Sequence, residues 1–166
     1  MQYKAAIITA SDKATEGQRE DLSGPVLEGL LNEMGFLVVS RKIVPDERTI
    51  ITAALMDLCD NGRADLILTT GGTGFSPRDI TPEATLDVID REVPGIPEAM
   101  RLESLKITPR AMLSRSIAGI RKKTLIINMP GSPKAAKECF EVLRPALDHA
   151  MEILTESGGE CGAAVS

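Results

Sequence analysis

Short apolar runs alternate with longer amphipathic stretches along this chain. The runs are too short for buried helices and are bounded by turn residues, which is typical of interior parallel strands. They lie at residues 3–9, 36–44 and 65–70. Stretches with apolar residues at helical spacing follow them, at residues 23–34, 50–60 and 81–93. The first 93 residues are therefore predicted to fold as β-α-β-α-β-α, with crossovers long enough for parallel pairing of the strands.

The pattern is less regular in the second half of the chain. It predicts an amphipathic stretch at 94–106, an antiparallel strand pair at 116–120 and 124–128, and a last helix from Ser132-Pro133 to Leu154. The apolar stripe of that helix keeps its phase through Pro145, so we expect one kinked helix. The fold class is α/β with a mostly parallel sheet.

Composition narrows the class of protein. The 166 residues fit one domain, which we place at residues 1–157, with a flexible tail at 158–166. A net charge of −5 and only four aromatic residues argue against nucleic-acid binding. No apolar run reaches 18 residues and no secretion signal is visible, so we expect no membrane association. The cysteines, at positions 59, 139 and 161, fit a reducing cytoplasm better than a disulfide framework.

The single histidine limits the available chemistry. His149 falls in the last predicted helix, far from any strand end, where it is expected on the surface. A zinc site is disfavoured with one histidine and scattered thiols. No Ser–His or Cys–His pair can form, which argues against covalent catalysis through a base-activated nucleophile.

A glycine-rich loop after the third predicted strand is the strongest candidate site. Three glycines occur within residues 71–74, Asp79 follows, and Thr81-Pro82 predicts an N-cap and first turn of a helix. Glycine removes the Cβ that would keep a ligand away from the peptide N–H groups. A glycine loop, a carboxylate and a helix N-terminus in this order suit an anionic ligand that carries a hard cation. The plain alternative is an ordinary strand-to-helix turn that is rich in glycine.

Other polar residues follow the remaining strands. In an open parallel sheet, ligands bind beyond the carboxyl ends of the strands. The sequence places these segments there: Ser11-Asp12, Asp46, residues 71–79 and residues 128–132. Taken singly, the two additional acids could cap turns or helices and Ser132 could be an N-cap. The basic residues nearby could be solvated charges; they are Arg78, Arg110, Arg115 and Lys134.

Three acids in one cleft argue against explaining each acid separately as a cap. Carboxylates repel each other unless a cation lies among them, and Mg²⁺ with phosphates meets that requirement. Phosphoryl or nucleotidyl transfer needs metal, positioning and charge stabilisation, and no protein nucleophile. The Walker pattern and G-x-G-x-x-G are both absent, which disfavours the kinase and dinucleotide classes.

Several longer motifs, in order, resemble the molybdopterin adenylyltransferase family, which includes bacterial enzymes of molybdenum cofactor synthesis and the gephyrin G domain. They are TTGGTG at 69–74, PRDITPEAT at 77–85, ESLKITP at 103–109, MLSRS at 112–116, AGIR at 118–121 and INMPGSP at 127–133. The resemblance implies a three-layer α/β/α sandwich and a homotrimer. It also implies an enzyme that uses Mg-ATP to adenylylate the terminal phosphate of molybdopterin.

The resemblance also implies roles for particular residues. Asp46 and Asp79 match the family's catalytic acids at the metal and the ATP phosphates. The substrate- and nucleotide-binding positions that match are Ser11, Asp12, Thr70, Gly71, Gly72, Thr73, Gly74, Pro130, Gly131 and Ser132. Ser132 departs from the family pattern, since many relatives have Asn there. Glu103, Lys106 and residues 112–116 also match the family, and the resemblance does not divide their roles between substrate contact and packing.

Two points about the reaction stay open at this stage. The fused second domain of the eukaryotic forms is absent, so a separate molybdenum insertase is expected downstream. The same fold also occurs in proteins that carry molybdopterin or insert the metal without adenylylation, and such a module is the alternative. The presence of both Asp46 and Asp79 favours the enzyme, because a carrier would not need two metal-binding acids.

Overall fold

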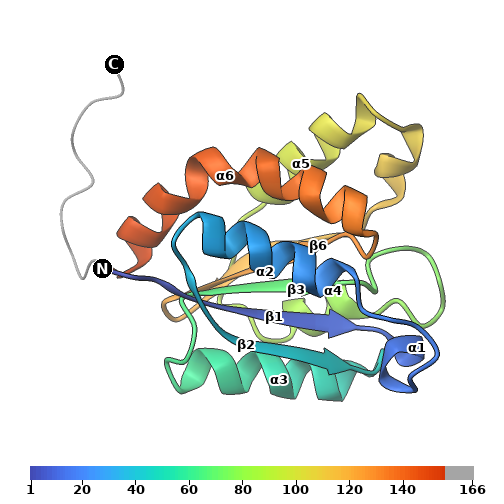
Figure 1. Cartoon of the computed structure of the whole chain (residues 1–166), viewed down its shortest axis with the longest axis horizontal. Coiled ribbons are helices and arrows are strands. Elements are labelled where there is room, and N and C mark those ends of the chain that lie inside the picture. The colour runs from blue at the N-terminus through green and yellow to red at the C-terminus, as the bar shows by residue number, and fades with distance from the viewer. Residues whose placement is uncertain (156–166) are drawn as a thin grey trace.

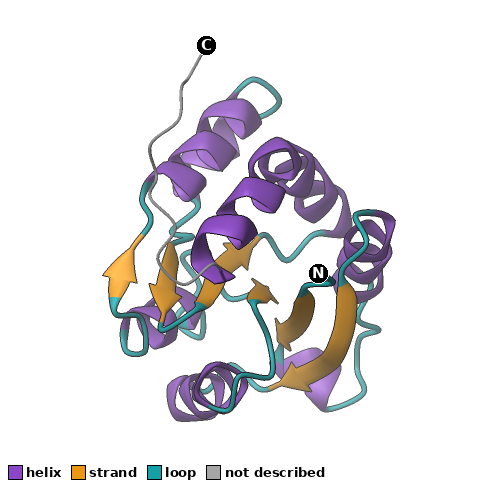
Figure 2. Ribbon diagram, turned by 90° about the vertical axis from the view of Figure 1, so that its left-hand side faces the viewer, coloured by secondary structure: helices purple, strands orange, loops and turns teal. Residues whose placement is uncertain are grey.

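A six-stranded sheet lies between two layers of helices (Figures 1 and 2). The structure, a computed structural model, describes residues 1–155. The strands are β1 (Lys4–Ala10), β2 (Leu37–Val44), β3 (Leu66–Thr70), β4 (Arg91–Glu92), β5 (Ala118–Arg121) and β6 (Thr124–Met129). Their order across the sheet is β2-β1-β3-β6-β5-β4. The pairs β2–β1, β1–β3 and β3–β6 are parallel, whereas β5 is antiparallel to both of its neighbours.

The helices divide between the two faces of the sheet. They are α1 (Asp12–Thr15), α2 (Ser23–Glu33), α3 (Arg48–Asp60), α4 (Thr81–Leu86), α5 (Gly95–Leu105), the 3₁₀ helix η1 (Pro109–Leu113) and α6 (Pro133–Thr155). Successive strand side chains point to opposite faces, so Ala5 and Ile7 pack with α2, α5 and α6. Ala6 and Ile8 pack instead with α3 and α4. Both faces are thus buried, which explains why the central strands read as continuous apolar runs.

The predicted three-layer α/β/α sandwich with a mostly parallel sheet is confirmed. The predicted antiparallel pair is β5–β6, and the last helix is continuous through Pro145. The connection expected at residues 13–22 contains the short helix α1, which the polar sequence did not indicate. The proposed tail at 158–166, like Cys161, lies outside the described residues.

The prediction of one helix over residues 81–93 was wrong. Helix α4 ends at Leu86, whose side chain is 45% exposed, and β4 follows at Arg91. The backbone N–H groups of Asp90 and Val93 donate to carbonyls of the β5 region at 2.8 Å, so sheet pairing replaces the last helical turns. Thr81 is not the N-cap either: Ile80 occupies that position, and Thr81 Oγ1 is buried without a hydrogen-bond partner among the described residues.

Candidate active site

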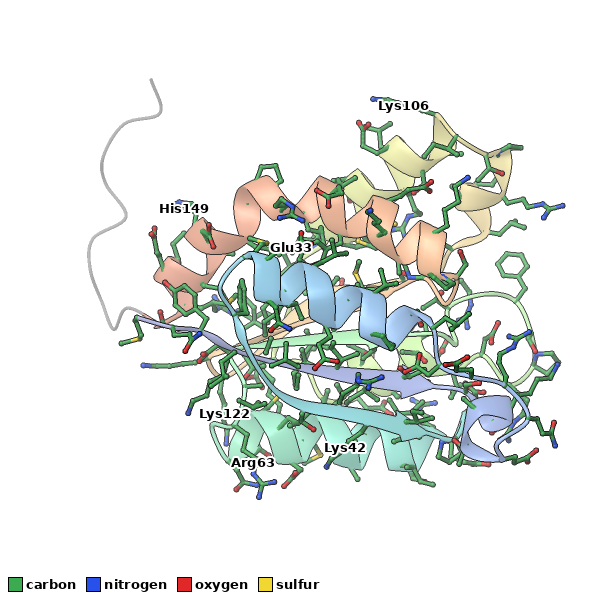
Figure 3. All side chains as sticks on the ribbon, in the orientation of Figure 1. Glu33, Lys42, Arg63, Lys106, Lys122 and His149 are labelled. Carbon is green, nitrogen blue, oxygen red and sulfur yellow. The ribbon has the colours of Figure 1, made fainter. Side chains whose placement is uncertain are left out.

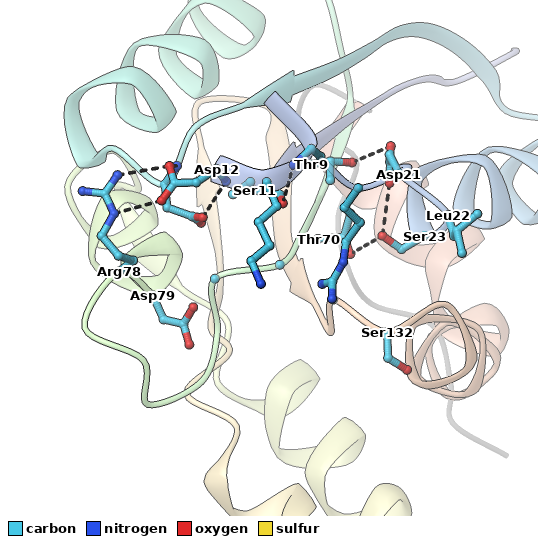
Figure 4. A pocket seen from close by; sticks show the side chains of 18 of the residues that line it. Thr9, Ser11, Asp12, Asp21, Leu22, Ser23, Thr70, Arg78, Asp79 and Ser132 are labelled. Carbon is cyan, nitrogen blue, oxygen red and sulfur yellow. Dashed lines mark hydrogen bonds and ion pairs between the residues drawn. The ribbon is translucent and has the colours of Figure 1, made fainter. Parts of the chain in front are cut away.

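The carboxyl ends of β1 and β3 open into a pocket of about 810 Å³, shown from close by in Figure 4. Nine of the predicted site residues line it: Ser11, Asp12, Asp46, Thr70, Gly71, Gly72, Asp79, Gly131 and Ser132. Thr73, Gly74 and Pro130 belong to the same loops but do not line the pocket. The sheet therefore brings most of the predicted residues together at one edge, as expected for an open parallel sheet.

Two glycines allow the loop after β3 to lie close to its neighbours. Gly71 has φ +89° and Gly72 has φ +68°, a backbone conformation that side chains other than glycine rarely adopt. A Cβ on Gly71 would collide with the carbonyl oxygen of Ala10. A Cβ on Gly72 would collide with Thr81 Oγ1 and lie 3.3 Å from Asp46 Oδ1. The glycine loop is thus in close contact with the end of β1 and with one of the predicted acids.

Asp12 and Asp46 bind each other's backbone. Asp12 N–H donates to Asp46 Oδ2 at 2.9 Å, and Asp46 N–H donates to Asp12 Oδ1 at 2.9 Å. Arg78 Nε donates to Asp12 Oδ2 at 2.9 Å, and its guanidinium also bonds Glu47 at 2.8 Å. The Arg78 contact, with the Asp46 N–H, holds the pKa of Asp12 below its usual value. Asp12 and Arg78 therefore join the loops to each other. Arg78 is 53% exposed, as expected of a surface charge, but it also pairs with two acids, which the sequence did not indicate.

Of the three acids predicted for the site, Asp46 and Asp79 remain for a ligand. Burial raises the pKa of Asp46 and the Asp12 N–H lowers it; the charges of Asp12 and Asp79 raise it further, and the charge of Arg78 lowers it. Asp79 Oδ2 accepts a hydrogen bond from Ser76 N–H at 3.0 Å, which fixes the carboxylate over the loop. A Cβ on Gly74 would lie 3.0 Å from the same oxygen. Asp46 thus lies beside Gly72 and Asp79 beside Gly74, and the two carboxylates are close enough to interact electrostatically.

The donor set fits Mg²⁺ that arrives with a phosphate ligand. Within residues 1–155, no group of three or more His, Cys, Asp or Glu side chains is placed to hold a metal ion by itself. Mg²⁺ is usually bound by one or two carboxylates, completed by water and substrate phosphates. Asp46 and Asp79 provide two hard oxygen donors, and the pKa of Asp46 is raised first by burial and then by the charges of Asp12 and Asp79. These two residues would hold the cation.

The opposite wall of the pocket is polar; Thr70 in it was predicted from the sequence, whereas Asp21 and Ser23 were not. The Asp21 side chain is only 4% exposed and accepts from Thr9 Oγ1 and Gly24 N–H, each at 3.0 Å. Thr70 Oγ1 donates to the Pro130 carbonyl at 2.8 Å and lies 3.0 Å from Ser23 Oγ, which joins the loops after β3 and β6 to α2. Thr70 and Pro130 thus help to shape the pocket wall by holding these loops together.

Two basic residues, Lys13 and Arg19, also line the pocket. Cationic side chains beside a glycine loop would complement an anionic ligand. Both residues belong to the connection directly after β1, which begins at the carboxyl edge of the sheet. That position in the sequence could have indicated that they lie near the site. The predicted N-cap role of Ser132 is confirmed, because Ser132 Oγ accepts from Ala135 N–H at 3.1 Å in the first turn of α6.

Other residues singled out in the sequence lie away from the pocket. The His149 side chain is 76% exposed on α6, as predicted, and Figure 3 shows it on the outer surface. Lys106 and Glu103 form an ion pair of 2.7 Å at the end of α5. None of the three is among the pocket-lining residues. The suggestion that Arg115 is a solvated charge was wrong, because its side chain binds the loop that carries Asp79.

The fold and site define an α/β domain with a pocket of small-molecule size at the carboxyl edge of its sheet. Residues 6–149 match the family described as "Probable molybdopterin binding domain", and the chain belongs to this family. The resemblance drawn from the motifs is confirmed.

Individual proteins of this family are similar to the chain over most of its length. The chain is 47% identical over 150 residues to "Molybdopterin adenylyltransferase" of Helicobacter pylori strain J99, covering 89% of this chain and 85% of the relative. It is 43% identical over 145 residues to the protein of that name in Escherichia coli strain K12, covering 86% and 74%. The crystal structure of the molybdopterin biosynthesis enzyme MoaB from Thermus thermophilus superposes with a TM-score of 0.88 at 47% identity, covering 93% of this chain and 97% of that one.

Proposed function

We propose that this protein is a molybdopterin adenylyltransferase: it transfers the adenylyl group of Mg-ATP to the terminal phosphate of molybdopterin and releases pyrophosphate. The relatives named for this activity support the proposal, since each match covers most of both chains. The observation that carries it is the position of Asp46 and Asp79 beside the glycine loop, in a pocket large enough for small-molecule ligands.

The reaction needs no covalent intermediate on the protein. An oxygen of the molybdopterin phosphate attacks the α-phosphorus of ATP, the bond from that phosphorus to the bridging oxygen breaks, and pyrophosphate leaves with its electron pair. A bound Mg²⁺ would offset the negative charge on the phosphates. Asp46 and Asp79 would hold the ATP phosphates in place through that cation, and the glycine loop would present N–H groups to phosphate oxygens. Lys13 and Arg19 line the same pocket and would oppose the remaining charge.

Pyrophosphate release separates this function from the carrier alternative. The purified protein should release pyrophosphate only when ATP, Mg²⁺ and molybdopterin are all present, in amounts equal to the adenylyl-molybdopterin formed. A protein that binds molybdopterin tightly but releases no pyrophosphate would be a carrier or insertion module. Replacing Asp46 by Ala should weaken Mg-ATP use more than molybdopterin binding, whereas equal loss of both affinities would assign Asp46 a structural role.

The assembly proposed for the enzyme is a homotrimer in the cytoplasm. Exposed apolar side chains on α5 and η1 support self-association; they are Leu102, Leu105, Met112 and Leu113. Among the helices of residues 1–155, none combines the length and apolar character that a membrane crossing needs. A separate molybdenum insertase would use the adenylylated product. Sedimentation at micromolar concentration should give a trimer, and a monomer would contradict the assembly.

A further inference from the structure

We propose that Arg115 is the positioning residue for Asp79: its guanidinium sets the shape of the loop at residues 73–79 and thereby aims the carboxylate into the pocket. This role rests on the proposed function, because Asp79 matters only if the pocket binds Mg-ATP. The loop contacts themselves are a property of the protein without substrate, so they can be tested separately.

Arg115 binds both ends of this loop. Its backbone N–H donates to the Thr73 carbonyl at 2.9 Å, and its Nε donates to the Gly74 carbonyl at 2.7 Å. Its Nη2 donates to the carbonyl of Asp79 itself at 2.8 Å. Its Nη1 forms an ion pair with Glu83 on α4, directly beyond the loop. One side chain, from a segment 32 to 41 residues away in the sequence, thus joins the start of the loop, its end and the following helix.

The middle of the loop is exposed and is joined to the rest of the protein through Arg78, whose side chain binds Asp12 and Glu47. The Phe75 side chain is 69% exposed, and the turn from Ser76 to Asp79 is closed by bonds within itself, including Asp79 N–H to the Ser76 carbonyl at 2.9 Å. If the two ends are released, the turn keeps its link to Asp12 and Glu47 through the exposed Arg78 side chain, which leaves it more freedom than backbone contacts at both ends do. The Asp79 carboxylate belongs to that turn through its bond to Ser76 N–H. Holding the carbonyls of Gly74 and Asp79 consequently fixes the carboxylate as well.

The geometry requires arginine rather than any cation. A guanidinium is a rigid plane of donors, and here three of its nitrogens reach three acceptors, two on the loop and one on α4. A lysine ammonium is a point charge on a flexible stem and cannot span the Gly74 carbonyl, the Asp79 carbonyl and Glu83 together. Arg115→Lys would keep the charge near Glu83 but release one or both ends of the loop.

The test uses Arg115→Lys, Arg115→Met and the control Arg110→Met, an exposed arginine of η1 five residues earlier. The first readout is chymotrypsin cleavage after Phe75 in the protein without ligands. Both Arg115 variants should be cut there several-fold faster than wild type and Arg110→Met, because the released loop fits a protease more readily. Equal cleavage rates for folded Arg115→Lys and wild type would overturn the proposed hold on the loop.

The second readout is steady-state kinetics. Arg115→Lys should lower kcat by about 10²-fold, the scale of a 1 Å misplacement of a catalytic group, while KM for molybdopterin changes little. Arg110→Met should retain wild-type kinetics. Arg115→Lys with wild-type kcat, in an assay where wild type is active, would overturn the positioning role. An inactive wild type would contradict the proposed function instead, and the cleavage result would still decide whether Arg115 holds the loop.

Discussion

Asn128 is the buried residue whose replacement most directly tests how the sheet supports the site. It lies in β6 and is fully buried. Its Nδ2 donates to Thr69 Oγ1 on β3 at 3.0 Å and to Thr85 Oγ1 on α4 at 2.9 Å. Its Oδ1 accepts from Ile117 N–H at 3.2 Å. Asn128→Ala removes all three bonds, which join β3, β6, α4 and the start of β5.

The expected cost follows from these contacts. A typical intramolecular hydrogen bond contributes about 1 kcal/mol net, so three bonds give about 3 kcal/mol. The small cavity left behind adds to this figure. For a chain of this size, each kcal/mol lowers Tm by about 2–4 °C, so Asn128→Ala should melt about 6–12 °C below wild type.

The assay is thermal unfolding at one protein concentration, followed by circular dichroism. The control is Asn32→Ala, the same substitution at an exposed position on α2, which should change stability by no more than about 0.5 kcal/mol. Asn128→Ala within about 2 °C of wild type would refute the reasoning, since the three bonds would then contribute almost nothing net.

Further predictions concern the loop and its acids. Gly71→Ala should destabilise the fold by about 1–3 kcal/mol in a melt, because of its φ of +89° and the collision with the Ala10 carbonyl. Gly74→Ala should keep wild-type stability but lower kcat, because its Cβ would lie 3.0 Å from Asp79 Oδ2; an unchanged kcat would argue against a fixed position for that carboxylate. The pKa of Asp46 is higher in the folded protein than its unfolded value of 3.8. The folded state therefore loses stability relative to the unfolded state as pH rises from 3.8 through the folded pKa and Asp46 ionises. The Tm of Asp46→Asn minus the Tm of wild type should therefore increase as pH rises through this range. A Tm difference that stays constant with pH would contradict the raised pKa.

The parts of the fold that could be predicted follow from local pattern. The central strands are buried on both faces, so their sequences are continuous apolar runs such as that of β3. Because parallel strands deliver their ends to one edge, the acids at 12, 46 and 79 could be placed together from sequence alone. Gly71 and Gly72 were recognisable because their positive φ angles favour glycine.

The parts that could not be predicted depend on contacts between distant segments. The end of α4 at Leu86 is set by the pairing of β4 with β5, almost 30 residues later. The contact of Arg78 with Asp12 and that of Arg115 with the 73–79 loop link residues 66 and 36–41 positions apart. An arginine that binds such partners and one that is solvated look alike in the sequence, so both were expected at the surface.

The measurement that tests the central claim most directly is pyrophosphate release by wild type and Asp79→Asn with ATP, Mg²⁺ and molybdopterin. Asn keeps the size of Asp79 and an oxygen acceptor for Ser76 N–H, but removes the charge that would hold the cation. Wild type should turn over, and Asp79→Asn should be slower by about 10²-fold or more, with an unchanged melt and molybdopterin titration. A folded Asp79→Asn protein that turns over at the wild-type rate would contradict the account.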